Sequence, residues 1–242
     1  MPSAPSNPAP LKAVLINCSL KREPGKSHTK TLLSVVGDIM QKNEVVGVHI
    51  QFAAHTVAFG VYPDMTEHGW AQDDWPKIWK QIGAADIIVI GMPIWLGEES
   101  SVCRLLIERL YAMSGMLNGK GQSIFYGKTG GAVITGNEDG IKHCAMSMLY
   151  ALQHLGCVIP PQADCGWIGE AGPGPSYGDE VDGKPAGFDN EFTQRNTTIM
   201  AWNLTHMARK LRGANGLPNE GNDRNAWDAG CQFDYENPEY RA

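Results

Sequence analysis

The chain has 242 residues, enough for one domain with a sizeable hydrophobic core. Its 26 Asp and Glu outnumber its 20 Lys and Arg, which argues against non-specific nucleic-acid binding because that requires a basic surface. No apolar run approaches the ~20 residues of a membrane-spanning helix, and the N-terminus lacks the charged and apolar regions of a secretory signal.

Short apolar runs alternate with helical patterns along the chain, after a first segment, residues 1–10, that we expect to be a disordered arm. Strands are predicted at 11–19, 45–52, 85–93 and 130–136, and a candidate fifth strand at 163–169. Helices are predicted at 28–42, 73–83, about 100–114, 141–155 and roughly 191–212. This alternation predicts a doubly wound α/β fold, in which helices cover both faces of a five-stranded parallel sheet.

Three loops of this fold are candidates for a ligand site. In doubly wound sheets, ligands bind outside the carboxyl ends of the strands, where the strand order reverses. The loops in question follow the first, third and fourth predicted strands. They read SLKREPGKSHT (19–29), PIWLGEESS (93–101) and TGNEDG (135–140).

The first loop has the features of a phosphate site. It leads into a helix N-terminus, which offers unpaired N–H groups and a partial positive charge. Hydroxyl and basic side chains add further donors: Ser19, Ser27, Thr29, Lys21, Arg22 and Lys26. The alternative is a solvated loop in which Ser27 only caps the helix.

Two matches to nucleotide-binding glycine motifs are incomplete. Gly25-Lys26-Ser27 resembles the end of a P-loop, but Leu20 stands where the first glycine is required. Gly127-Lys128-Thr129 has Gln122 at that position and leads into a strand. No GxGxxG follows any predicted strand, so we predict neither P-loop chemistry nor that dinucleotide fingerprint.

The second and third loops combine apolar surface with backbone amides. Pro93 stiffens the turn and Gly97 permits close approach, while Trp95 between them presents a flat apolar side chain. The alternative for Trp95 is packing over the sheet or in a subunit contact. The third loop, with two glycines, taken by itself favours a simple strand-to-helix turn in which Asn137 or Asp139 caps the next helix. Together the three loops suit a ligand with a phosphate at one end and a flat heteroaromatic ring at the other.

Cysteine and histidine provide no further motif. The six cysteines are scattered without a CxxC, so we expect reduced, mostly buried thiols in a cytoplasmic protein, and no cysteine nucleophile. A metal site is disfavoured, because His143 and His154 are separated by about 16 Å along one predicted helix.

With these loops the sequence resembles the flavodoxin-like NAD(P)H-dependent FMN reductase family, over roughly residues 11–212. The resemblance implies FMN as cofactor, NAD(P)H as co-substrate, and ping-pong hydride transfer to a small acceptor such as a quinone, free flavin or nitroaromatic. It also implies a homo-oligomer, and amides near 94–97 and 136–140 that favour anionic reduced flavin. The residues that match the family's cofactor loops are Ser19, Lys21, Ser27, His28, Thr29, Pro93, Ile94, Trp95, Leu96, Gly97, Thr135, Gly136, Asn137, Glu138, Asp139 and Gly140.

Two segments depart from the family pattern. Residues 166–190 form a long Gly/Pro/acidic loop, of which 172–177 could contact flavin or substrate. The irregular tail 213–242 carries several aromatic residues, so we expect it to pack on the body or on a second subunit. Two other functions remain open, namely an electron-transferring flavodoxin and a non-catalytic FMN-binding protein.

Overall fold

The computed structural model describes residues 9–23, 25, 27–170, 172, 174–231 and 233. Most of the predicted N-terminal arm, residues 1–8, lies outside this part of the chain. Five parallel strands run in the spatial order β2-β1-β3-β5-β6, which is the flavodoxin-like order and confirms the predicted fold class. Their bounds are β1 (Leu11–Asn17), β2 (Val45–Gln51), β3 (Ile87–Trp95), β5 (Thr129–Gly136) and β6 (Asp164–Ile168).

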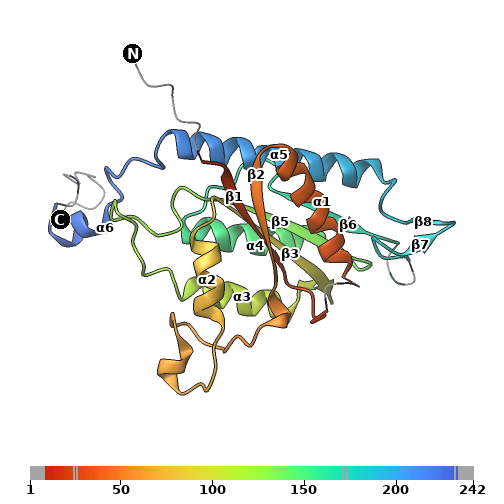
Figure 1. Ribbon diagram of the computed structural model, residues 1–242, viewed down its shortest axis with the longest axis horizontal. Coiled ribbons are helices and arrows are strands. Elements are labelled where there is room, and N and C mark those ends of the chain that lie inside the picture. Colours follow the sequence, from red (N-terminus) through yellow and green to blue (C-terminus); the bar gives the residue numbers. More distant parts are fainter. Residues whose placement is uncertain are drawn as a thin grey trace, which may run out of the picture.

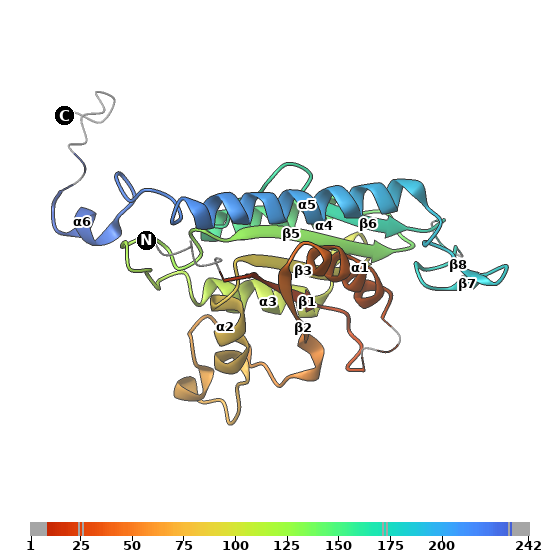
Figure 2. The same ribbon diagram turned by 45° about the horizontal axis from the view of Figure 1, so that its top comes forward.

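Helices cover both faces of this sheet (Figures 1 and 2). The helices are α1 (His28–Lys42), α2 (Trp75–Gly83), α3 (Ser101–Tyr111), α4 (Ile141–Leu155), α5 (Glu191–Gly213) and the short α6 (Arg224–Asp228). Helices α1 and α5 share one core with Ala13 and Leu15, whereas α2, α3 and α4 share the other with Val14 and Ile16. Successive residues of a buried strand therefore pack alternately into the two cores on opposite faces of the sheet.

All ten predicted elements are present, and the largest shift of their ends is at α3, predicted over 100–114. The strand predicted over 85–93 runs on to Trp95 and turns back into β4 (Glu98–Glu99), which pairs antiparallel with it. A hairpin of β7 (Glu180–Val181) and β8 (Lys184–Pro185) lies within the long loop before α5. Two single 3₁₀ turns, Phe52–Ala54 and Met65–His68, lie between β2 and α2.

Close packing of α1 on the sheet positions the first candidate loop. Helix α1 begins at Ser27, whose side chain accepts a hydrogen bond from the Lys30 amide at 3.2 Å. A β-carbon on Gly91 would lie 2.3 Å from the side chain of Leu33. Glycine in β3 thus lets the start of α1 lie directly over the carboxyl ends of β1 and β3.

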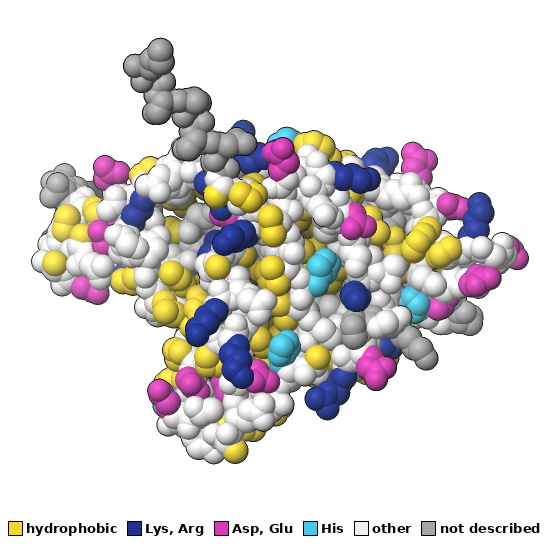
Figure 3. Space-filling model, viewed as in Figure 1, with side chains coloured by type: hydrophobic (Ala, Val, Ile, Leu, Met, Phe, Trp, Pro, Cys, Tyr) yellow, Lys and Arg dark blue, Asp and Glu magenta, His cyan; other side chains and the backbone are white. Residues whose placement is uncertain are grey.

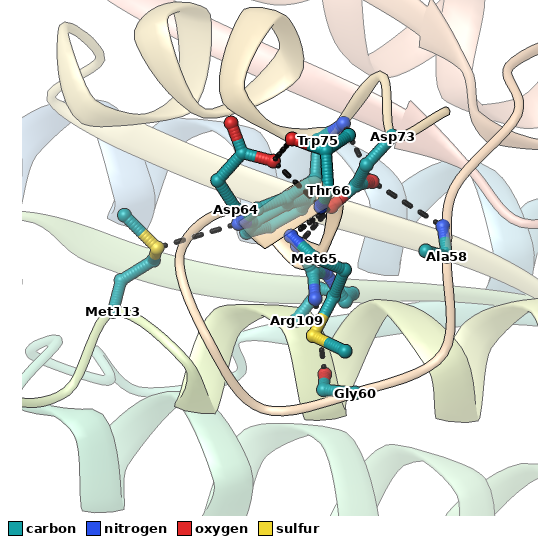
Figure 4. A network of polar contacts seen from close by, with 9 residues as sticks. All are labelled: Ala58, Gly60, Asp64, Met65, Thr66, Asp73, Trp75, Arg109 and Met113. Carbon is teal, nitrogen blue, oxygen red and sulfur yellow. Dashed lines mark hydrogen bonds and ion pairs between the residues drawn. The ribbon is translucent and has the colours of Figure 1, made fainter. Parts of the chain in front are cut away.

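A buried ion pair links the long segment between β2 and α2, residues 52–74, to α3 (Figure 4). Arg109 and Asp73 are both fully buried, and the Arg109 Nη2 lies 2.6 Å from the Asp73 Oδ2. Arg109 also donates to the carbonyl of Gly60 and lies over the ring of Trp75. The Asp73 carboxylate in turn accepts the amides of Ala58, Met65 and Trp75.

The part of the tail that is described touches the body through polar contacts. Gln122 donates to the Pro218 carbonyl and to the Asn222 side chain, both at 2.8 Å. The Arg224 amide donates to the Gly121 carbonyl at 2.9 Å. Trp227 is 46% exposed, and Tyr235 and Tyr240, which we expected to pack, lie outside the described residues.

Acidic and basic side chains are interspersed over the face shown in Figure 3, where neither sign forms an extended patch among the residues described. Within the described ranges, every helix is too short or too polar to cross a lipid bilayer.

Candidate functional site

A cavity of about 280 Å³ lies where β1, β3 and β5 end, at the point where the strand order reverses. Twelve of the sixteen predicted site residues line it. These are Ser19, Lys21, Ser27, His28, Thr29, Pro93, Ile94, Trp95, Thr135, Gly136, Asn137 and Glu138. Leu20, Ser176 and Tyr177 complete the lining, the last two from the segment that we had singled out within the long loop.

Four predicted residues are not part of the cavity wall. Leu96 and Gly97 form the turn between β3 and β4. Asp139 is exposed, and Gly140 packs against this turn, since a β-carbon there would lie 2.5 Å from the Gly97 carbonyl oxygen. These residues therefore shape the loops that bear the cavity rather than the cavity itself.

A hydrogen-bonded network supports the end of the cavity at the start of α1. Asn17 donates to the Ser27 hydroxyl at 3.1 Å and to the Gln51 side-chain oxygen at 2.7 Å. The Asn17 oxygen accepts the amide of Ser19 at 3.1 Å, and Gln51 donates to the Ser19 hydroxyl at 3.3 Å. The two hydroxyl residues that were predicted as phosphate donors are thus oriented by two amide side chains.

Prediction from sequence missed Asn17 and Gln51. They are the last residues of β1 and β2 and lie directly opposite each other in the parallel register. Polar residues at the ends of two predicted strands were the available signal, but strand pairing and register are needed to bring them together.

Thr29 and Thr135 join the first and third loops. Both residues are buried, and their hydroxyl oxygens lie 2.7 Å apart. Because Thr29 is in the first turn of α1 and Thr135 is near the end of β5, this bond closes the cavity floor across β3. The first turn also presents backbone N–H groups that have no acceptor within the helix itself.

His28 fastens the long loop to the start of α1. Its Nδ1 accepts the Gly178 amide at 3.0 Å, so the Nε2 carries the proton and faces the Asp179 carboxylate at 3.3 Å. Between these contacts and the body, Tyr177 is buried against Trp167 and Phe188. Burial raises the pKa of the Tyr177 phenol, with a further contribution from Cys165, so the hydroxyl stays neutral at pH 7.

Asn137 holds the other end of the same loop. Its amide group donates to the Gly174 carbonyl at 3.1 Å, and its backbone carbonyl accepts the Gly172 amide at 2.9 Å. The long loop is therefore anchored on both sides of the segment that lines the cavity. This arrangement makes it a fourth wall of the cavity, beside the three predicted loops.

The turn after β3 places Trp95 at the mouth of the cavity. Leu96 and Gly97 have φ of 53° and 81°, as in a type I′ turn, and Trp95 pairs with Glu98 across it. Trp95 is 52% exposed and Leu96 is 92% exposed. Packing, the alternative that the sequence left open for Trp95, accounts for only about half of its surface.

The Leu96 amide has an acceptor within the protein, since it donates to the Glu138 Oε2 at 2.7 Å. We had expected the amides of 94–97 to stabilise an anionic reduced flavin. The Leu96 amide is committed to a carboxylate instead, which sets the local charge at this end of the cavity.

Three of the buried cysteines are unreactive as thiols. Burial raises the pKa of Cys144 to about 11 and of Cys157 and Cys165 to about 12, so these thiols are not nucleophilic thiolates at neutral pH. No group of three His, Cys, Asp or Glu is arranged to hold a metal in the described ranges. A larger hollow, of about 620 Å³, lies between α3, α4 and residues 222–224, away from all the predicted site residues.

Residues 11–167 match the sequence profile of the NADPH-dependent FMN reductase family. The chain belongs to this family. The match covers the three candidate loops and both elements that flank each of them, and it ends near the start of the long loop. Thirteen of the fifteen residues that line the cavity lie within this match, and Ser176 and Tyr177 of the long loop lie beyond it.

Two curated relatives are similar to the chain. The chain is 55% identical over 202 residues to a divalent metal cation transporter of Mycobacterium bovis, with 84% of the chain and 29% of that protein aligned. It thus spans less than a third of this relative's length. It is 31% identical over 207 residues to an 8-demethyl-8-aminoriboflavin-5′-phosphate synthase of Streptomyces davaonensis, with 84% and 79% aligned.

A solved structure extends the similarity to the whole fold. It is RosB with the bound intermediate 8-demethyl-8-formylriboflavin-5′-phosphate, which superposes with a TM-score of 0.79 at 28% identity. The superposition covers 96% of this chain and 94% of the other, so it includes the long loop that the family match leaves out.

Proposed function

We propose that the chain is an FMN-dependent oxidoreductase that passes a hydride from NAD(P)H through FMN to a small acceptor such as a quinone, free flavin or nitroaromatic. The observation that carries the proposal is the cavity at the switch point of a family fold, with hydroxyl and amide donors at one end and Trp95 at the other. FMN has the matching polarity, a phosphate joined by a ribityl chain to a flat ring system.

At the phosphate end, this chain's residues would act by binding and orientation. Ser19, Ser27 and Thr29 offer hydroxyl groups around the N-terminus of α1, whose backbone dipole favours an anion. Lys21 adds a positive charge at the same wall. The Asn17–Gln51 network holds two of these hydroxyls in place before a ligand arrives, which lowers the entropy lost on binding.

At the ring end, Pro93, Ile94 and Trp95 offer apolar surface, and Tyr177 closes the wall contributed by the long loop. Bound FMN supplies hydride transfer itself, so the protein has to orient it, exclude water and set the surrounding charge. Because Trp95 stays half-exposed, the ring side of the cavity remains open to a second substrate. We therefore assign no residue as a dedicated acid or base.

NAD(P)H as co-substrate and a homo-oligomeric state remain parts of this proposal. The activity, substrates and partners of the whole protein are likewise part of the proposal.

The test begins with the colour of the purified protein. We expect a yellow protein, or a colourless one that binds added FMN, whose flavin spectrum bleaches under anaerobic NADH or NADPH. Steady-state oxidation of the nicotinamide with a quinone present distinguishes the reductase from an electron-transferring flavodoxin and from a non-catalytic FMN-binding protein. A protein that ignores FMN contradicts the proposal.

A second candidate follows from the flavin-modifying relative and the RosB structure, both described with riboflavin-5′-phosphate derivatives. In that case the chain would bind a riboflavin phosphate as substrate and alter its ring. Mass spectrometry of the flavin released after turnover separates the two candidates. An unchanged flavin mass with sustained nicotinamide oxidation supports the reductase, whereas a changed mass supports the modifying enzyme.

A further inference from the structure

Glu138 is the one carboxylate among the described residues that line the cavity. It follows β5 in the third loop, and its Oε2 accepts the Leu96 amide at 2.7 Å from the turn after β3. The contact joins residues that are 42 positions apart in the chain. It fixes the direction of the carboxylate, because an amide in a tight turn has a fixed orientation.

The second oxygen of this carboxylate has no hydrogen-bond partner among the described residues and is not among their fully buried unpaired atoms, so it is open to solvent. The neighbouring residues of the ring end are Pro93, Ile94, Trp95 and Tyr177, none of which provides a positive charge. A flat ligand that displaces water from this end would leave a carboxylate oxygen without a donor, which is unfavourable. A suitable ligand should therefore bring its own donor to that oxygen.

We propose that Glu138 is a specificity-determining residue that accepts the ring N–H of the bound flavin. This inference rests on the proposed function. The oxidised flavin ring has one N–H, at N3 of its pyrimidine part, between two carbonyl groups. The carboxylate attracts that N–H in a charge-assisted hydrogen bond and repels a carbonyl oxygen in its place, so it selects the end of the ring that enters the site.

The experiment compares FMN with 3-methyl-FMN, in which a methyl group replaces the N3 hydrogen. Dissociation constants are measured for the apoprotein by quenching of flavin fluorescence, so that no turnover is needed. The wild type should bind FMN about tenfold or more tightly than the methylated flavin. Glu138→Ala should reduce this ratio to about one, because the acceptor is gone and the methyl group has room.

Two further variants separate the hydrogen bond from charge. Glu138→Gln keeps an acceptor oxygen without the charge, so its ratio should lie between those of the wild type and Glu138→Ala. The control is Glu98→Gln, which removes a carboxylate from the same turn. Glu98 is exposed, pairs with His143 at 2.9 Å and does not line the cavity, so this variant should keep the wild-type ratio.

Equal affinity of the wild type for both flavins would overturn the inference. So would an equal loss of both affinities in Glu138→Ala, because that result makes Glu138 only a support for the Leu96 turn. If the wild type binds neither flavin, the proposed function itself fails, and this result is distinct from FMN binding without discrimination at N3. Thermal unfolding of each variant establishes that the compared proteins are folded.

Discussion

The hydroxyl oxygens of Thr29 and Thr135 lie 2.7 Å apart beneath the cavity, although 106 positions separate them in the chain. Thr135→Val should destabilise the protein by about 1–3 kcal/mol, because it leaves the buried Thr29 hydroxyl without a partner. The double variant Thr29→Val/Thr135→Val should regain much of this stability, since both polar groups are gone, but not FMN affinity. Urea unfolding and FMN titration measure the two effects. Parallel recovery of stability and affinity would show that these hydroxyls do not contact the ligand.

Trp95 is exposed enough to be removed without loss of the fold. Trp95→Ala should weaken FMN binding about tenfold, while Trp95→Phe should retain part of the affinity because an aromatic face remains. The control is Trp202→Ala on α5, a residue that is 39% exposed and does not line the cavity. Flavin fluorescence titration and visible spectra check the outcome. An unaltered spectrum and affinity in Trp95→Ala would remove Trp95 from the site.

The buried Arg109–Asp73 pair in Figure 4 should contribute most of the stability of the segment between β2 and α2. Asp73→Asn leaves the Arg109 charge buried without its counterion and should cost about 3–5 kcal/mol. Asp189→Asn, which breaks the exposed Lys184–Asp189 pair, should cost less than about 1 kcal/mol. Chemical denaturation of both variants provides the comparison. Similar small losses in both would mean that Arg109 finds other acceptors.

Thiol reactivity should separate one cysteine from the other five. Cys231 is exposed and the remaining five cysteines are buried. With an aromatic disulfide reagent at pH 8, the native protein should release one equivalent of thiolate rapidly, and six in guanidinium. Cys144, Cys157 and Cys165 should react slowly even as the pH approaches 9, because their pKa values are raised to about 11 to 12. Cys231→Ser should abolish the rapid phase.

Removal of residues 213–242 should lower the melting temperature or change the oligomeric state. The physical reason is the loss of the hydrogen bonds that Gln122 and Gly121 make with residues 218–224. A shorter truncation, of residues 234–242, leaves all of these contacts and is the matched control. Melting curves and light scattering check the two proteins. Identical behaviour of the long truncation and the full chain would contradict the packing role that we assign to the tail.

Much of the fold could be predicted because hydrophobic spacing reports directly on burial. The pattern from Leu11 to Asn17 faces two cores, and the spacing of Leu32, Leu33 and Val36 marks the buried face of α1. The rule for ligand sites in doubly wound sheets then brought three distant loops together. This topological argument selected the three loops, and the resemblance to the family selected the residues within them, of which twelve line the cavity.

The remaining features depend on contacts that spacing does not encode. The pairing of Asn17 with Gln51 requires the register of two strands, and the His28 contact requires the path of the long loop. The strand β4 has only two residues, too few for periodicity to detect. The positive φ of Leu96 was not expected, because leucine is disfavoured in that conformation.

That leucine has a consequence for the engineering of this protein. A type I′ turn favours Asn or Gly at its first central position, and Leu96, with a side chain that is 92% exposed, has almost no packing to offset its conformational strain. Leu96→Gly or Leu96→Asn should therefore raise the melting temperature, by relief of roughly 1 kcal/mol. With Leu96 the turn is less stable than it would be with glycine or asparagine at the same position. The stabilised variants would show whether the exposed leucine side chain has a function that compensates for this loss of stability.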